Sequence, residues 1–260
     1  MRFAIFIVML ISICAAPSAE AQNSPGSVGQ DRVVAIPRWL HELPEGDFTI
    51  GISHRERDEE NMQAYAKQYA TVSKSRNDNS ICIIKYTHQS SDLTHKDAEA
   101  RFEINVSASP DSLMKIYKAL ELIDNYNLYE NFVGIYSNQK RELSDYYRDT
   151  ITPYLDAQEF AEPIIVKDTK VESYSTGSST NLISAWDRAA EIARNQLAAY
   201  VQKNVQSFVG RVDEKMHKDI AIETSIILGK MRISKSIITM EMVDNLLSYV
   251  VYLKIEMERD

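Results

Sequence analysis

The sequence has little cysteine, which limits covalent cross-linking. Its 260 residues include two, Cys14 and Cys82. Cys14 lies in an N-terminal segment that has the features of a cleavable signal peptide, so the predicted mature chain keeps only Cys82. With one thiol no intramolecular disulfide can form, although an exported chain reaches a compartment that allows one. Cys82 lies in the apolar run SICIIKY, which predicts a buried thiol and not a reactive one.

Glycine and histidine are also scarce, and this excludes several kinds of catalytic site. The eight glycines form no G-x-S-x-G pattern and no glycine-rich phosphate loop. No two of the five histidines have the i, i+4 spacing of a helical zinc site, and no pair of cysteines accompanies them. His88 and His95 flank a polar loop, and we expect both to be solvated.

The carboxylates show no catalytic arrangement in the sequence. Those of RERDEE (55–60) and RELSD (141–145) lie beside arginines in polar stretches, which is typical of a solvated charged face and not of an acid/base pair. No acidic run has the Asp-x-Asp-x-Asp-Gly form of a calcium loop. We therefore expect no catalytic residue, no metal and no cofactor, and predict that the protein is not an enzyme.

Positive charge is in deficit. The chain has 29 Lys and Arg against 37 Asp and Glu, a formal net charge of −8. This balance argues against nucleic acid as a partner, because neutralising phosphates requires clustered cations. It also argues against electrostatic attachment to anionic lipid. Beyond the N-terminus no apolar run is long enough to cross a bilayer, so we expect no transmembrane segment after signal cleavage.

The first 21 residues predict export. Arg2 precedes an apolar run, and Ala19-Glu20-Ala21 fits the A-x-A cleavage rule, which would make Gln22 the new N-terminus. A retained membrane anchor and a lipid on Cys14 are the alternatives. The run is shorter than the roughly 20 residues of a spanning helix, and Ile13 stands where a lipidation signal has a small residue. We expect a bacterial envelope protein, periplasmic or associated with the outer membrane.

The remaining chain is predicted to hold two α+β units. A signal peptide (1–21) and a flexible lead (22–36) precede the first unit (37–137), and a polar connector (138–160) leads to the second (161–260). Each unit has a normal domain size. In each we expect a small, mostly antiparallel sheet with helices packed on one face.

In the first unit, Trp39 is the expected apolar anchor before the β-prone run GDFTIGIS (46–53). A helix is predicted from Asp58 or Glu59 to the NDN at 77–79. Its predicted buried stripe has helical spacing and consists of Met62, Tyr65, Ala66, Tyr69, Ala70 and Ser73.

The rest of the first unit is predicted to be mainly strands. SICIIKYTH (80–88) is a strand candidate, and 97–108 is ambiguous between helix and strand. Residues 114–123 and 129–137 are predicted as two strands joined by a turn at DNYN (124–127).

The second unit begins with the β-prone run EPIIVKDTKVESY (162–174), and a helix follows with a capping box at Ser184-Ala185-Trp186-Asp187. Its predicted buried face is Trp186, Ala190, Ala193, Leu197 and Tyr200, and its predicted wet face is Asp187, Arg188, Glu191, Arg194 and Asn195. Residues 205–212 resemble a strand and 213–230 have helical character. Two closing strands are predicted at 231–242 and 248–257.

The order of elements is therefore the same twice. Each half has a strand, an alanine-rich helix, a strand, a helical or irregular stretch and two closing strands. The closing hairpins match residue by residue around Ile123-Asp124-Asn125 and Val243-Asp244-Asn245. This predicts an internal duplication of a unit of about 100 residues. Chance similarity between two generic α+β units is the alternative.

Tyrosines gather between the first hairpin and the connector. One interpretation is half-buried packing between the two units, since tyrosine has an apolar body and a polar tip. The other is a protein-binding surface, where tyrosine is enriched. The six candidates for such a surface are Tyr126, Tyr129, Tyr136, Tyr146, Tyr147 and Tyr154.

Two stretches resemble a known family. Trp39, Pro44, Phe48, Gly51 and Ser53, followed by the helix QAYAKQYA, are similar to the LPP-twenty-type lipoproteins and to the related N-terminal domain of the flagellar T-ring protein FlgT. In the second half, DRAAEIARNQLAAYV looks like that family's A-x-x-x-A-R-x-x-L-A helix, with Ser207 after it. The first helix departs from the pattern, with Tyr and Gln where the family has Ala and Arg. The resemblance implies an envelope protein without a known catalytic centre, either a surface lipoprotein or part of a larger assembly.

The sequence thus favours a non-enzymatic exported protein that binds other envelope proteins or itself. One alternative is a secreted ligand-binding protein or hydrolase with a site between the two units, since ligands often bind where domains meet. A surface lipoprotein or adhesin is the other alternative.

Overall fold

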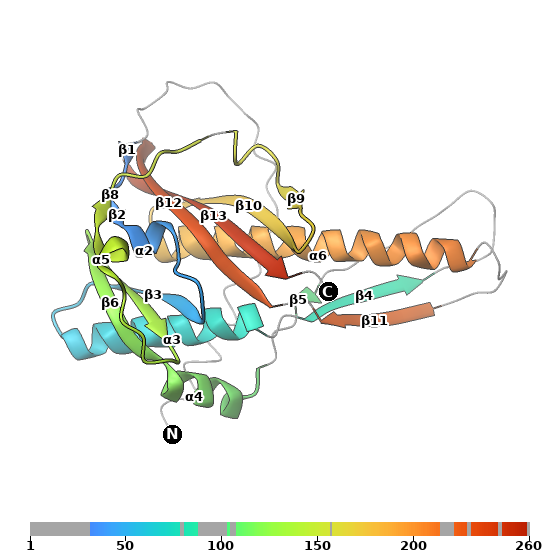
Figure 1. Cartoon of the computed structure of the whole chain (residues 1–260), viewed down its shortest axis with the longest axis horizontal. Coiled ribbons are helices and arrows are strands. Elements are labelled where there is room, and N and C mark those ends of the chain that lie inside the picture. The colour runs from blue at the N-terminus through green and yellow to red at the C-terminus, as the bar shows by residue number, and fades with distance from the viewer. Residues whose placement is uncertain are drawn as a thin grey trace.

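The fold is α+β, as predicted, and every strand pair in the described part of the chain is antiparallel (Figure 1). The computed structural model describes residues 32–78, 81–87, 103–104, 108–156, 158–213, 221–227, 230–243 and 246–258. The predictions for the signal peptide, for His88 and His95 and for the Cys82 side chain lie outside what is described, and so does Asp244-Asn245 of the second closing hairpin.

The first half forms a three-stranded sheet in the order β3-β7-β6. β3 (Phe48–His54) opens it, and the hairpin of β6 (Glu121–Leu128) and β7 (Asn131–Ser137) completes it. Helix α3 (Glu59–Asp78) packs on this sheet, and α4 (Pro110–Ala119) packs against α3.

The second half forms a five-stranded sheet in the order β1-β12-β13-β10-β9. Its centre is β10 (Lys170–Ser179) with the long hairpin β12 (Met231–Val243) and β13 (Leu246–Glu258). The edge strands are β1 (Arg32–Val33) and β9 (Ile164–Val166). Helix α6 (Leu182–Asp213) packs on this sheet (Figure 1).

The two halves share two features of construction. In each, the opening strand pairs with the last strand of the closing hairpin. In each, the following helix lies directly on a glycine of that strand. A Cβ on Gly51 would lie 2.3 Å from the carbonyl oxygen of Ala66, and one on Gly177 would lie 2.3 Å from that of Ala185. Only a residue without a Cβ permits such an approach. The duplication itself stays a prediction.

The halves are joined by shared strands and a shared core. Strand β4 (Ile81–Thr87) follows α3, and β11 (Ala221–Ile227) follows α6. These two strands pair along their whole length. Strand β5 (Glu103–Ile104) pairs with β4. One continuous hydrophobic cluster includes Ile52 and Val133 of the first half and Trp186 and Val251 of the second. A smaller cluster lies between α3 and the other face of the first sheet. The first sheet is therefore enclosed between α3 and the second half.

The N-terminal segment crosses to the second half. Strand β1 pairs with β12. Strand β2 (Ile36–Pro37) pairs with β8 (Thr150–Ile151). Helix α2 (Arg38–His41) contacts both α5 (Asp145–Arg148) and β12. Residues 32–36 were expected in a flexible lead. They are instead part of the fold, because Val34 and Ile36 are 7% and 0% exposed. Trp39, the predicted anchor, is buried.

Helix α3 and the strands β12 and β13 match their predictions closely, but four other assignments are wrong. Residues 110–119 form α4, where a strand was predicted from 114, because Ser109 caps the helix and Pro110 starts it. Asp124 and Asn125 lie within β6, and the turn comes later, at Tyr129 and Glu130. Residues 205–212 continue α6, and 221–227 form β11 and not a helix. A helix already formed extends at little cost, which overrides the β-propensity of Val and Phe.

The start of α6 also differs from its prediction. The helix begins at Leu182 and not at the capping box around Ser184. The Asn181 side-chain oxygen accepts hydrogen bonds from the backbone N–H groups of Ile183, at 2.8 Å, and Ser184, at 3.3 Å. Asn181 is therefore the residue that caps the helix.

A charged cleft between the two halves

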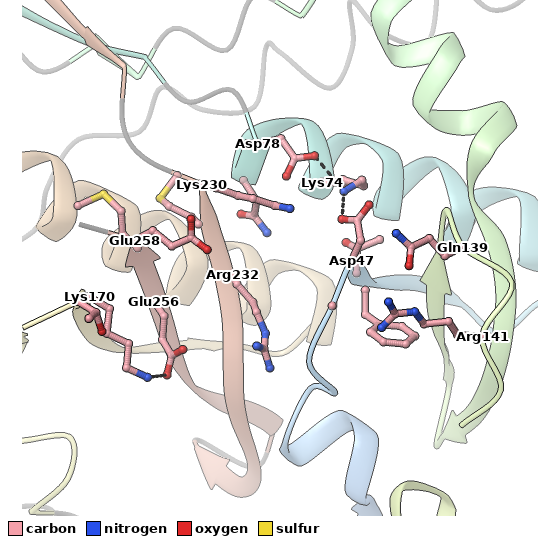
Figure 2. Close-up of a pocket in the computed structure, with 17 residues that line it drawn as sticks. Asp47, Lys74, Asp78, Gln139, Arg141, Lys170, Lys230, Arg232, Glu256 and Glu258 are labelled. Atoms are coloured by element: carbon pink, nitrogen blue, oxygen red, sulfur yellow. Dashed lines mark hydrogen bonds and ion pairs between the residues drawn. The ribbon is translucent and has the colours of Figure 1, made fainter. Parts of the chain in front are cut away.

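A cleft of about 740 Å³ lies between the two halves (Figure 2). The first half contributes residues from the turn before β3, the end of α3 and the segment after β7. The second half contributes the start of β10, the start of β12 and the end of β13. The charged side chains that line it are Asp47, Lys74, Asp78, Arg141, Lys170, Lys230, Arg232, Glu256 and Glu258.

The turn before β3 shapes one wall. Gly46 has φ of +120°, a conformation that side chains with a Cβ rarely adopt. A Cβ at Gly46 would also lie 2.8 Å from Nη1 of Arg141. Glycine therefore allows the tight turn and leaves the space that the Arg141 guanidinium occupies beside Phe48.

Most of the carboxylates in the cleft are already paired. Lys74 contacts Asp47 and also Asp78, the latter at 2.9 Å between Nζ and Oδ2. Burial alone would lower the pKa of Lys74, but these two carboxylates outweigh it and raise that pKa. On the opposite wall, Lys170 donates to Glu256 at 2.9 Å. Burial favours protonation of Glu256, yet its bonds from Lys170 and Lys254 lower the pKa of its carboxyl.

Three cations of the cleft have no acidic partner among the described residues. Arg141 and Lys230 are exposed and make no ion pair in this part of the chain. Arg232 donates from Nη2 to the carbonyl oxygen of Leu43, at 2.5 Å, across the junction between the halves. Its Nε is buried and has no hydrogen-bond partner within the described residues. Positive charge in the cleft is therefore only partly compensated.

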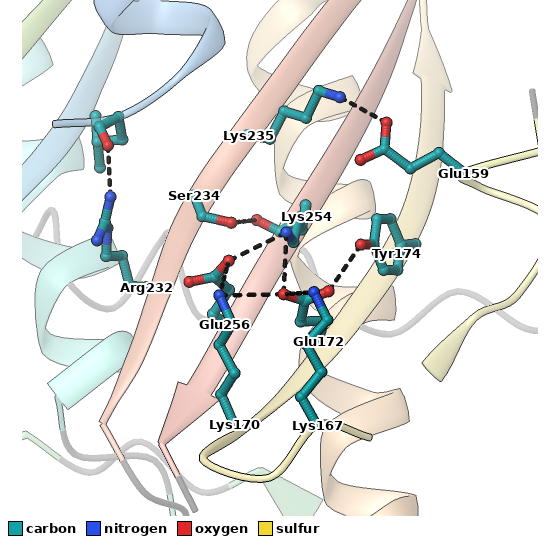
Figure 3. A network of polar contacts seen from close by, with 11 residues as sticks. Glu159, Lys167, Lys170, Glu172, Tyr174, Arg232, Ser234, Lys235, Lys254 and Glu256 are labelled. Atoms are coloured by element: carbon teal, nitrogen blue, oxygen red, sulfur yellow. Dashed lines mark hydrogen bonds and ion pairs between the residues drawn. The ribbon is translucent and has the colours of Figure 1, made fainter. Parts of the chain in front are cut away.

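A second polar cluster stands beside the cleft on the same sheet (Figure 3). The side chain of Glu172 is fully buried, and its Oε1 lies 2.8 Å from Nζ of Lys167 and 3.1 Å from those of Lys170 and Lys254. The Tyr174 hydroxyl donates to Oε2 at 2.9 Å. Burial would raise the pKa of Glu172, but these bonds outweigh it and lower the pKa to about 2. This carboxylate is fully satisfied and links β10 to β13.

These pKa directions favour ion pairing over proton transfer. A general acid or base works best with a pKa near the working pH. Glu172 and Glu256 move away from neutrality, as do Lys74 and Lys170. These groups therefore stay charged at neutral pH and hold one another in ion pairs.

Helices α3 and α6 meet through polar contacts. The Tyr69 hydroxyl donates to Asp187 at 2.6 Å, and Nη2 of Arg194 donates to the side-chain oxygen of Asn77 at 2.8 Å. Arg194 is 4% exposed. The prediction that Asp187 and Arg194 lie on a wet face was therefore wrong, because α3 covers that side of α6. The buried face of α6 from Trp186 to Leu197 is confirmed.

The six candidate tyrosines do not form one surface. Tyr136 is 1% exposed and belongs to the core. Tyr126 and Tyr147 are half-buried against the main cluster. The exposed members are Tyr129, Tyr146 and Tyr154. Tyr146 is held by Arg38, whose guanidinium lies 4.2 Å from the ring centre. Tyr65, predicted in the buried stripe of α3, is exposed as well.

Two of the five histidines and the carboxylates of 55–60 lie in the described part of the chain. Nδ1 of His41, which is buried, lies 2.8 Å from the carbonyl oxygen of Ser236, and Nε2 of His54 lies 2.9 Å from the Asn181 amide. The carboxylates of 55–60 are exposed, as predicted. Among the described residues, no three His, Cys, Asp or Glu side chains are grouped so that they could hold a metal ion.

Comparison with known proteins adds no relative. No known family, no curated protein and no solved structure matches this chain. In the described part of the chain, no helix combines the length and apolarity needed to cross a membrane.

Proposed function

We propose that this chain is a non-enzymatic, exported protein of the bacterial cell envelope that acts by binding another envelope protein. The observation that carries the proposal is the apolar end of the β12–β13 hairpin. There Met242 and Leu246 are each 61% exposed and Leu247 is 43% exposed. Exposed large apolar side chains that cluster in this way mark interaction sites.

The strand register shows that this end is apolar on both faces. Met242 lies opposite Leu247, so these two side chains share one face of the hairpin, and Leu246 points to the other. From Ser248 onward β13 is largely buried. The hairpin end therefore projects beyond the packed part of the sheet, beside β1 (Figure 1).

A tyrosine of the first half lies near this end. The Asn131 amide donates to the Tyr249 hydroxyl at 3.4 Å, which holds the β6–β7 turn next to β13. Tyr129 in that turn is 52% exposed. Exposed aliphatic side chains with a nearby tyrosine are typical of a protein-binding patch. We therefore favour a protein partner.

The test is site-specific cross-linking in intact cells. A photo-reactive phenylalanine analogue in place of Leu246 should give discrete adducts with a second protein. The same analogue in place of Glu191, an exposed residue of α6, should give none. Adducts that appear equally from both positions, or from neither, would exclude the hairpin end as the docking site.

A pair of polar variants checks the role of the side chains. Leu246→Ser with Leu247→Ser should abolish recovery of that partner. Val166→Ser, at a 47% exposed apolar residue on the edge strand β9, should leave recovery unchanged. Circular dichroism confirms that the variants are folded.

The envelope location and the resemblance to LPP-twenty-type proteins belong to the same proposal. The signal peptide supports export, and the shared strand order and glycine contacts of the two halves support related units. Mass spectrometry of the mature N-terminus distinguishes the forms of export. A start at Gln22 means soluble export, whereas a lipid on Cys14 means anchoring and the lipoprotein alternative.

A second candidate function is ligand binding in the cleft. Its volume lies in the range of small-molecule sites, and it forms where the two halves meet. The hydrolase version of this alternative has less support, because Glu256, a carboxylate of the cleft, is held in ion pairs with Lys170 and Lys254.

A further inference from the structure

We propose that the cleft binds the anionic head group of a small polar molecule, a phosphate or a carboxylate, through Arg232, Arg141 and Lys230. This deepens the second candidate function by naming the chemical class of its ligand. It is independent of the docking site at the hairpin end.

Arg232 is the centre of the proposed site (Figure 2). It lies in β12 opposite Glu256, but it makes no ion pair with that carboxylate among the described contacts and instead reaches across to Leu43. Nη2 thus has a protein partner, while the buried Nε lacks an acceptor among the described residues. A buried donor without a partner carries an energetic penalty, and an anion that drew the guanidinium toward the cleft would give this donor an acceptor.

Arg141 and Arg232 flank the same short segment of chain. Arg232 is bonded to Leu43, and the Arg141 guanidinium stands over Gly46, three residues further on. Arginine presents a planar fork of donors that matches the oxygens of a carboxylate or phosphate. A Cβ at Gly46 would displace the Arg141 fork from its present position.

Lys230 adds a third charge two residues before Arg232. Its carbonyl oxygen accepts a bond from the N–H of Glu258 at 3.4 Å, which fixes its backbone at the cleft. Its ammonium group is exposed and has no ion-pair partner within the described chain. It can therefore move toward a bound anion at little cost.

The charge balance of the cleft limits how many negative charges the ligand can carry. Five cationic and four acidic side chains line it, which leaves one net positive charge in a protein whose overall charge is −8. A polyanion would meet the carboxylates of the same walls. A molecule with one anionic group and an otherwise polar, uncharged body fits this balance.

The test is calorimetric titration of the mature chain, residues 22–260, at constant ionic strength. The probes are inorganic phosphate, phenyl phosphate and acetate, with glucose and putrescine as neutral and cationic comparisons. We expect saturable binding of at least one anion and none of glucose or putrescine. The two phosphate probes against acetate distinguish a phosphate site from a carboxylate site.

Matched variants locate the site. Arg232→Gln and Arg141→Gln should each weaken binding by about tenfold to a hundredfold, the usual effect of losing a hydrogen bond to a charged group. Arg38→Gln, an arginine outside the cleft that packs on Tyr146, should leave affinity unchanged. Arg232→Lys keeps the charge without the fork and should bind at an intermediate level, which also controls for misfolding of Arg232→Gln.

Three results would overturn the inference. One is the absence of saturable binding by every anion tested. Another is equal weakening by Arg38→Gln and Arg232→Gln, which would reflect net charge and not a site. The third is binding of glucose or putrescine in the cleft without any anion, which would leave the second candidate function standing but refute the anionic class.

Discussion

The contact between α6 and Gly177 gives the sharpest stability prediction. In Gly177→Ala, the new Cβ would lie 2.3 Å from the Ala185 carbonyl oxygen and 2.5 Å from the Ala189 nitrogen. Non-bonded heavy atoms prefer about 3.5 Å, so the helix has to move by about 1 Å from the sheet. Both obstacles are backbone atoms of α6, and no rotamer change can relieve them.

The expected cost follows from this geometry. Forcing extra atoms into a packed core typically costs about 1–3 kcal/mol. Alanine also restricts the unfolded chain, which offsets about 0.4–1 kcal/mol. The two effects leave a net loss between about 0 and 2.6 kcal/mol, and because both obstacles are backbone atoms we expect the upper part of that range, about 1–2.5 kcal/mol, or roughly 2–10 °C in melting temperature for a chain of this size. Urea unfolding followed by circular dichroism measures this loss. The slope of the unfolding free energy against urea concentration should stay at its wild-type value.

Gly134→Ala is the matched control. Its Cβ would meet only side-chain atoms, Cδ1 of Leu122 at 2.8 Å and Cε2 of the buried Tyr136 at 2.9 Å, and the half-buried Leu122 can rotate away. Because no backbone atom stands in the way, its loss should be smaller than that of Gly177→Ala. Gly51→Ala should behave like Gly177→Ala, because the Ala66 carbonyl oxygen is 2.3 Å away. Wild-type stability for Gly177→Ala, or an equal loss for Gly134→Ala, would refute the reasoning.

Two further predictions concern ionisable groups. Glu172 and Glu256 have a lowered pKa when folded, about 2 for Glu172, against an ordinary value of 4.5. The stability that these two carboxylates contribute is complete above about pH 4.5 and is lost as the pH falls toward 2. The urea midpoint of unfolding should therefore drop across that range. Glu172→Gln should make this drop smaller, whereas the same change at the exposed Glu162 should leave it as it is. Tyr69→Phe removes the donor to the half-buried Asp187 and should cost about 1–3 kcal/mol. A double-mutant cycle with Asp187→Asn should give a coupling energy above about 0.5 kcal/mol, whereas additive effects would show that the contact contributes nothing.

Local patterns predicted the parts of the fold that depend on local order. The charged start of α3 and its small-residue stripe placed that helix, and Asp58 does accept bonds from the N–H groups of Glu60 and Asn61. The alternation of β12 and β13 placed both strands. At α4 the apolar residues that suggested a strand belong to a helix. The signal that marks its start is short, the cap at Ser109 followed by Pro110, and was outweighed by the apolar pattern.

A site between the two units was one of the alternatives, but the residues that line the cleft could not be predicted, for a different reason. Its residues come from segments up to about two hundred positions apart, such as Asp47 and Glu258, and none forms a motif with its neighbours. Periodicity likewise identified the apolar face of α6 but could not show that a second helix covers Asp187 and Arg194. Which polar face is solvated depends on what packs there, and a single helix pattern does not contain that information.

The pairing of β1 with β12 has a consequence for how the chain reaches its final state. Arg32 lies opposite Met240, so the first described strand finds its partner only when more than two hundred further residues have been delivered. Contacts between such distant positions are slow to form, because a very large loop must close. Until then the hydrogen-bonding edge of β12 stays open to any other strand. A chain that emerges N-terminus first must therefore keep β1 unpaired until β12 has been made.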